Sequence, residues 1–239
     1  MPLLLSVRSA SAALLLLAAF GCSGDGGGSS PTAPLPTEAL GRAAETHSAA
    51  ASSTVYAVST DTVLSLEEVD DLGTYDAPSG WWELALPLRN GGSARLRLQW
   101  GNAEGSVQEH YSGATTTWVR LVGSTTASVA FVGSSERSDV EVTFDLTLSG
   151  IEASSNWVTI DGSGTTSALL GRTTFVVMHL GQVRSGLGYP GDGAMTVSLG
   201  AINAQLRFRG QQGVEGMYYD PYNLRYFSVD LTNGDIYRD

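Results

Sequence analysis

Apolar and polar residues alternate strictly over residues 140–148. The apolar side chains of this segment, all Val, Phe or Leu, fall on every second position, and Glu, Thr and Asp occupy the positions between them. A period of two places residues of one kind on one face of a β-strand. We therefore expect Phe144 and Leu146 to be buried in a core, with Glu141 and Asp145 exposed on the opposite face.

Other segments show the same period and predict further strands. In 94–100 and 204–209, apolar residues alternate with arginine and glutamine. The remaining candidate strands are 54–59, 62–67, 81–89, 117–122, 127–132, 156–161, 173–181, 194–199 and 225–231.

Turn residues separate these strands. Asn90-Gly91 and Asn233-Gly234 each lie between two strand candidates, and an Asn-Gly pair tolerates the positive φ that a type I′ hairpin turn requires. No helical period supplies the crossover of a parallel sheet, so the strands should pair antiparallel. We expect an all-β protein: a single antiparallel domain of short hairpin-connected strands over residues 54–239, built as a β-sandwich or as an open or closed barrel.

Residues 1–22 have a different character. One arginine precedes the apolar stretch 12–20, which is too short for a transmembrane helix and has the order of a secretory signal. The ending Ala19-Phe20-Gly21-Cys22 resembles the lipobox of bacterial lipoproteins, in which a small residue precedes a lipid-modified cysteine. The resemblance implies a lipid anchor on Cys22, and Ser23 directly after it implies the outer membrane of the cell envelope.

Cys22 is the single cysteine of the chain, so no intramolecular disulfide can form. A lone thiol has little place in an exported protein unless it is modified, which favours lipidation. Residues 23–53 begin with Gly, Ser and Pro and continue into an Ala-rich stretch interrupted by Gly41. We expect this segment to be a disordered tether with a possible short helix. The membrane, reached through the lipid, is then the first partner of the protein.

The charge balance excludes one class of partner. The formal net charge is −11 at pH 7, and an acidic surface repels nucleic acid and anionic headgroups. We therefore expect no nucleic acid among the partners.

Beyond the signal segment, the β domain resembles Gly/Thr-rich exported bacterial proteins, a diffuse likeness that implies no functional residues.

Catalytic and metal-binding motifs do not emerge from the residue pattern. The chain holds three histidines: His47 in the expected tether, His110 beside Glu109, and His179, which should share a core or rim face with neighbouring strand residues. The G-x-G-x-x-G match at 186–191 contains Pro190 and lacks the helix that a dinucleotide site needs. We therefore predict no catalytic residues, no metal and no cofactor, and a protein that is not an enzyme.

Tyrosines gather near the C-terminus, in residues 217–226, next to an Asp-Pro turn that should form a surface hairpin tip or long loop over 218–223. Aromatic rings can stack on sugars, so this segment is the candidate ligand site, although tyrosine is also an ordinary strand residue. The candidate ligand-binding residues are Tyr218, Tyr219, Asp220, Tyr222, Asn223 and Trp81.

Arginines alternate on two strand candidates, at 95 and 97 and at 207 and 209. If the two strands lay side by side, the arginines would together form a site for a carboxylate, a phosphate or an acidic sugar. If they did not, each arginine would pair with an acidic residue on a neighbouring strand. We favour the second interpretation.

The expected function is that of a membrane-anchored cell-envelope lipoprotein whose β domain is a structural or binding module, with a glycan or another envelope protein as its partner. Three rivals remain. A glycan-binding domain would expose aromatic rings, an envelope hydrolase would bring His110 near a carboxylate in a cleft, and a lipid carrier would contain an apolar cavity of several hundred Å³, as is typical of small-molecule sites.

Overall fold

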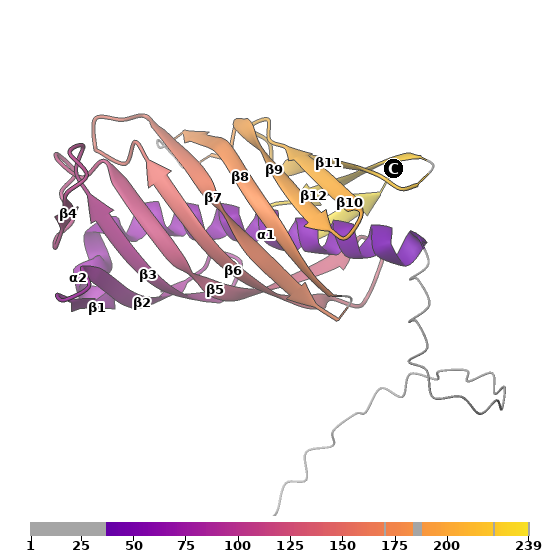
Figure 1. Cartoon of the computed structure of the whole chain (residues 1–239), viewed down its shortest axis with the longest axis horizontal. Helices are drawn as coiled ribbons and strands as arrows, with labels where there is room; N and C mark the ends of the chain where they lie inside the picture. The colour runs from indigo at the N-terminus through magenta and orange to yellow at the C-terminus, as the bar shows by residue number, and fades with distance from the viewer. Residues whose placement is uncertain (1–36, 170, 184–187, 222, 239) are drawn as a thin grey trace, which may run out of the picture. The chain divides into compact units, whose positions relative to one another are not determined.

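Nine strands, β5 to β13, close into a barrel, which confirms the all-β prediction and selects the closed barrel among its alternatives (Figure 1). The structure is a computed structural model, and it describes residues 37–169, 171–183, 188–221 and 223–238. The helical elements are α1 (Thr37–Ser65), η1 (Leu66–Glu68) and α2 (Val69–Leu72). The strands are β1 (Gly73–Asp76), β2 (Trp81–Pro87), β3 (Ser93–Gly101), β4 (Val107–Gln108), β5 (Trp118–Phe131), β6 (Ser138–Ser149), β7 (Trp157–Ala168), β8 (Gly171–Val183), β9 (Asp192–Leu199), β10 (Ile202–Arg207), β11 (Gly213–Tyr219), β12 (Leu224–Asp230) and β13 (Asp235–Arg238).

Consecutive strands from β5 to β13 pair antiparallel, as the hairpin pattern predicts. The ring closes where β13 pairs with the end of β5, and this closing pair is parallel. The earlier part of β5 pairs instead with β3, so that β1, β2 and β3 extend from the barrel as additional strands. The Asn-Gly turns lie where expected, between β2 and β3 and between β12 and β13, with Gly91 and Gly234 at positive φ.

Helix α1 lies inside the barrel and corrects the sequence-based prediction for residues 37–67. The segment 37–53 is helix rather than tether, and the strands expected at 54–59 and 62–67 do not exist. The helix contacts strands all around it, including β5, β6, β7, β9, β10 and β12, and Figure 1 shows it running along the barrel behind the sheet. Successive residues such as Ala49, Ala50 and Ala51 are all fully buried. A helix that is buried on every side has no separate polar face. Its sequence therefore lacks the 3.6-residue alternation of apolar and polar residues by which an amphipathic helix is predicted.

Small side chains allow the helix to fit the lumen. Its central part is composed mainly of Ala, Ser and Thr, and a barrel of this strand number has little internal space. The buried hydroxyls of Ser52, Ser53 and Ser59 donate to the carbonyl oxygens four residues earlier, over 2.8, 2.7 and 2.6 Å. These bonds satisfy hydroxyl groups that would otherwise be costly to bury.

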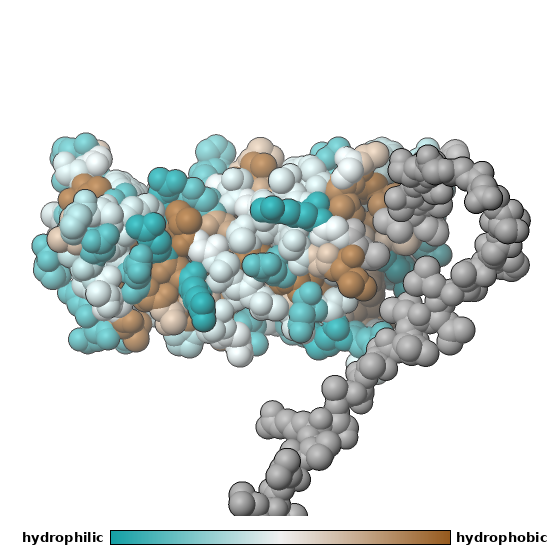
Figure 2. Space-filling model, turned by 60° about the horizontal axis from the view of Figure 1, so that its bottom comes forward, coloured by the Kyte–Doolittle hydropathy of each residue, from teal (hydrophilic) through white to brown (hydrophobic). Residues whose placement is uncertain are grey.

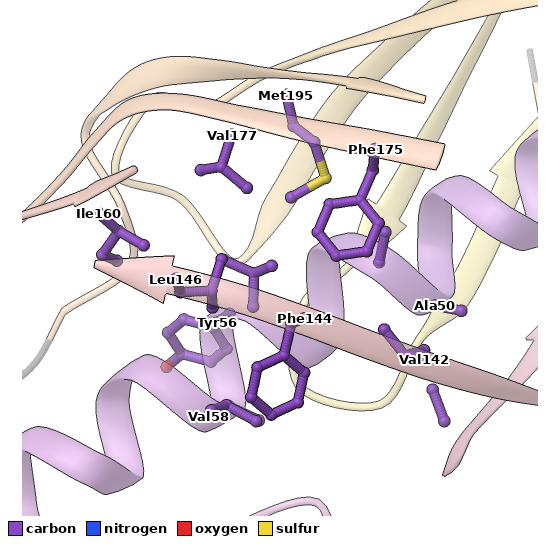
Figure 3. Close-up of a cluster of buried hydrophobic side chains, with 14 of the residues drawn as sticks. Ala50, Tyr56, Val58, Val142, Phe144, Leu146, Ile160, Phe175, Val177 and Met195 are labelled. Atoms are coloured by element: carbon purple, nitrogen blue, oxygen red, sulfur yellow. The ribbon is translucent and has the colours of Figure 1, made fainter. Parts of the chain in front are cut away.

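The inward faces of the strands complete the core. Phe144 and Leu146 of β6 are buried, as predicted, and lie against Tyr56 and Val58 of α1 (Figure 3). Glu141 is exposed, but the prediction for Asp145 was too simple. Its carboxylate is only partly exposed and accepts two hydrogen bonds from Arg120 on β5, at 2.9 and 2.7 Å, which lower the pKa of Asp145.

Glycines make room for aromatic rings on neighbouring strands. The ring of Phe175 lies over Gly164, and the ring of Phe227 lies over Gly216; in both places a Cβ would come within 2.5 Å of the ring. Such pairs fill the space beside a glycine and accommodate the curvature of a closed barrel.

The outward positions are mostly charged or hydroxyl-bearing, and Figure 2 shows a surface on which hydrophobic groups are scattered among hydrophilic ones. His179 belongs to this outer surface, contrary to the prediction of a core or rim face. A register shift between Met178 and Gly181 reverses the alternation there, and His179 takes a positive φ of 49°. Among the described residues, no helix has the length and apolarity needed to cross a membrane.

Candidate binding site at the barrel mouth

The tyrosine-rich segment forms a hairpin at one end of the barrel, as its turn residues predict. Strands β11 and β12 pair from Gly213↔Asp230 to Tyr219↔Leu224, and Asp220, Pro221 and Asn223 lie at the tip. Two hydrogen bonds close this tip: the Asp220 N–H donates to the Asn223 carbonyl over 3.0 Å, and the Asn223 N–H donates to Asp220 Oδ1 over 2.7 Å.

A cavity of about 490 Å³ opens beside this hairpin, between the hairpin, β13 and the first turns of α1. We call it the mouth cavity. Its lining residues are Thr37, Glu38, Glu45, Tyr218, Asp220, Asn223, Arg225, Tyr226 and Arg238.

Buried Glu45 forms the floor of the mouth cavity. The Tyr218 hydroxyl donates to its Oε1 over 2.9 Å, and the Arg238 guanidinium donates to its Oε2 over 2.6 Å. Burial, together with the nearby Glu45 carboxylate, raises the pKa of Tyr218 to about 12. Gly41 of α1 makes this arrangement possible, because a Cβ at that position would lie 2.5 Å from the Tyr218 hydroxyl.

The other charges of the mouth cavity are also paired. Arg225 Nε donates to Asp220 Oδ2 over 2.8 Å, and Glu38 pairs with Arg42 over 3.1 Å on the outer turn of α1. Each carboxylate in the lining therefore has its own guanidinium. The cavity presents fixed donors and acceptors without a large excess of either charge.

The six ligand-binding residues predicted from the sequence do not all lie in one place. Tyr218 lines the mouth cavity but is buried, and Glu45 accepts the hydrogen bond of its hydroxyl. Asp220 and Asn223 line the mouth cavity, whereas Tyr219 is exposed on the outer barrel face. Tyr222 lies outside the described residues, as does Cys22.

Trp81 does not join the mouth cavity. Its ring lies under the guanidinium groups of Arg97 and Arg120, at 5.1 and 5.8 Å from the ring centroid. Three other residues of the mouth cavity, Glu45, Arg225 and Arg238, were not predicted as site residues from the sequence. Glu45 could not be found, because the segment that holds it was assigned to the tether.

His47 was also assigned to the tether and is instead fully buried inside the barrel. Its Nδ1 lies 2.8 Å from Thr166 Oγ1, and its Nε2 has no hydrogen-bond partner among the described residues. Burial lowers the pKa of His47, which favours the neutral imidazole.

The arginine rungs do not combine into one site. Arg95 and Arg97 lie on β3 and Arg207 on β10, and these strands are not neighbours in the sheet. Arg97 pairs with Glu83 at 3.3 Å, and Arg209 pairs with Glu215 at 3.0 Å. The favoured interpretation, separate surface ion pairs, is confirmed for these two residues.

His110 does lie near a carboxylate, as the hydrolase rival requires. Its Nδ1 is 3.0 Å from Asp70 Oδ2, but both side chains are more than half exposed. Asp70 lines a cavity of about 280 Å³, and His110 does not. The pair is therefore a solvated contact of which only the carboxylate reaches the cavity, whereas the rival needs both groups in a cleft.

The lipid-carrier rival predicts an apolar cavity of several hundred Å³, and α1 occupies the lumen in which a barrel would hold such a cavity. In the part of the chain that the structure describes, no group of three or more His, Cys, Asp or Glu residues is placed to hold a metal ion.

Comparison of the chain with protein-family models, with curated proteins and with solved structures finds no match.

Proposed function

We propose that this protein is a non-enzymatic, lipid-anchored module of the outer cell envelope that binds a polyhydroxylated ligand of the glycan class. The lipid anchor is proposed from the lipobox-like ending at Cys22. The ligand class is proposed from one observation, the mouth cavity with its paired charges and its tyrosine ring.

The chemistry of the lining favours sugars over ions. A sugar offers many hydroxyl groups that both donate and accept, and carboxylate, guanidinium and amide groups at fixed positions can match them. Among the described residues, Arg225 donates only to Asp220, through its Nε, and the side-chain amide of Asn223 has no partner, because it is the Asn223 backbone N–H that donates to Asp220. Tyr226 is about half exposed beside them and offers a flat face to the C–H face of a sugar ring. A simple anion or cation would find the charges of the cavity already paired.

Calorimetric titration tests this proposal. Full-length protein carrying Cys22→Ser, which removes the lipid, is titrated with cellobiose, maltose and diacetylchitobiose. We expect at least one disaccharide to bind, and Arg225→Ala or Asn223→Ala to weaken that binding by about tenfold or more, the equivalent of one lost charge-assisted hydrogen bond.

The matched control is Arg207→Ala, which removes an exposed arginine of β10 outside the mouth cavity. It should leave both binding and the melting temperature unchanged. If none of the three sugars binds, or if Arg207→Ala weakens binding as much as Arg225→Ala, the proposed function is wrong.

A further inference from the structure

Three exposed tyrosines lie on the outer face of the barrel next to the mouth cavity. Tyr219 on β11 is 71 % exposed, Tyr226 on β12 is 53 % exposed, and Tyr237 on β13 is 45 % exposed. Apolar rings of this size usually pack against a core, and three of them in water on adjacent strands need another explanation.

The strand register sets these rings in a diagonal row. Tyr219 pairs with Leu224, two positions before Tyr226, and Tyr237 pairs with Ser228, two positions after Tyr226. Each ring is thus displaced from the next by one strand and two residues in the same direction. Diagonal neighbours of this kind are about 7–8 Å apart, so the row covers three strands without the rings having to stack on one another.

The row and the mouth cavity are continuous, because Tyr226 belongs to both. Within the described residues, the hydroxyls of Tyr219, Tyr226 and Tyr237 have no hydrogen-bond partner, in contrast to the Tyr218 hydroxyl, which Glu45 holds. The three exposed rings therefore combine apolar faces with free polar tips.

We infer that the tyrosine row extends the mouth cavity into a site for a polysaccharide chain, with one sugar unit held at Tyr226 and the cavity beside it, and the units on either side of it lying across Tyr219 and Tyr237. This inference rests on the proposed glycan-binding function and narrows its ligand from a single sugar to a chain. A linear series of rings suits a chain whose flat faces recur along its length, whereas a single sugar would use only Tyr226.

Other partners fit the row less well. The net charge of −11 opposes nucleic acid and anionic lipid surfaces. The cross-strand neighbours of the row are Leu224 opposite Tyr219, Met217 opposite Tyr226 and Ser228 opposite Tyr237, and Leu224 and Met217 are partly buried. The most exposed groups of the row are the tyrosine rings with their free hydroxyls, which suit a ligand rich in hydroxyl groups better than the desolvated apolar core of a protein interface.

Chain length is the variable that tests the inference. The Cys22→Ser full-length protein is titrated with the hexasaccharides of the same three sugar series used as disaccharides above. We expect the hexasaccharide of the bound series to bind about tenfold or more tightly than its disaccharide. Tyr219→Ala and Tyr237→Ala, both outside the mouth cavity, should remove that gain and leave disaccharide binding unchanged.

The control is Trp157→Ala, which deletes an exposed ring of β7 and should leave hexasaccharide binding intact. If the disaccharide binds but the hexasaccharide binds no more tightly, or if the two tyrosine variants leave its affinity unchanged, the chain site is wrong and the proposed function stands. If neither length binds, both are wrong. Adsorption of the protein to phosphatidylcholine vesicles that is lost in the same tyrosine variants would assign the row to a membrane surface and overturn the chain site.

Discussion

At the scale of single residues, the most consequential group is Glu45, a carboxylate buried inside the barrel with an arginine and a tyrosine from two different strands. Its ion pair with Arg238 ties the buried helix to the last strand of the sheet. Removing one partner of a buried pair leaves the other without compensation and usually costs several kcal/mol. We expect Glu45→Ala to lower the free energy of unfolding by about 2–4 kcal/mol, because Arg238 remains partly solvated.

Urea denaturation measures this effect, and Glu38→Ala is the matched control on the same helix. Glu38 also pairs with an arginine, but both side chains are more than half exposed. A surface pair of this kind contributes about 0.5 kcal/mol or less. Equal losses for the two variants would show that burial does not strengthen the Glu45 contact.

His47 makes the stability of the barrel depend on pH. Burial lowers its pKa below the ordinary value of 6.5, so the unfolded chain binds a proton at a higher pH than the folded protein does. The free energy of unfolding should therefore fall as pH drops through about 6.5 and should level off below the folded pKa.

This dependence is measured by urea denaturation at about pH 7.5 and about pH 5.5 for the wild type and for His47→Gln. We expect the wild type to lose more stability between these pH values than the variant does. Exposed His110 and His179 are present in both proteins and cancel in the comparison. Identical losses would contradict a buried neutral imidazole at position 47.

At the scale of elements, sequence periodicity was sufficient for most of the barrel and failed for the helix. Strands β6, β8 and β9 were predicted close to their observed bounds, because one face of each meets the core and the other meets water. Two predicted strands, 117–122 and 127–132, are one long strand, β5. Helix α1 was not predicted because it contacts the core on every side and shows no helical period. Its β-branched residues between 54 and 63 are typical of strands, so strands were predicted there instead.

The same surroundings predict how α1 responds to larger side chains. Ala49, Ala50 and Ala51 point about 100° apart around the helix axis, yet all three are fully buried. Replacing any one of them with leucine should overpack the lumen and lower the free energy of unfolding by about 1–3 kcal/mol. Chemical denaturation of the three variants, with Arg42→Leu on the exposed outer turn as the control, measures this. A helix lying on the outside of a sheet would tolerate leucine at one or more of the three positions.

At the scale of the whole molecule, the candidate site joins residues that lie far apart in the sequence. The hairpin tip was foreseeable from Asp220-Pro221 and its flanking tyrosines. The opposite wall of the mouth cavity could not be predicted from the sequence. Glu38 and Glu45 line it because α1 lies inside the barrel, and Arg238 lines it because β13 closes the barrel against β5. Local patterns predict turns and strand faces, whereas the meeting of chain ends depends on a closure that no local pattern encodes.

Attachment of the whole protein to a membrane is the remaining prediction, and it concerns Cys22. If this cysteine carries the lipid, the mature chain begins there, and thioether-linked acyl chains hold the protein in the membrane fraction. Cys22→Ser should then move the protein to the soluble fraction or leave it at full length, because the processing that depends on the lipid is blocked. Mass spectrometry of the mature N-terminus is the direct measurement. Ser23→Ala, which keeps the cysteine, should remain membrane-bound. A wild-type chain that starts elsewhere and carries no acyl mass would refute the anchor, while the proposed sugar site, which is tested on unlipidated protein, would be unaffected.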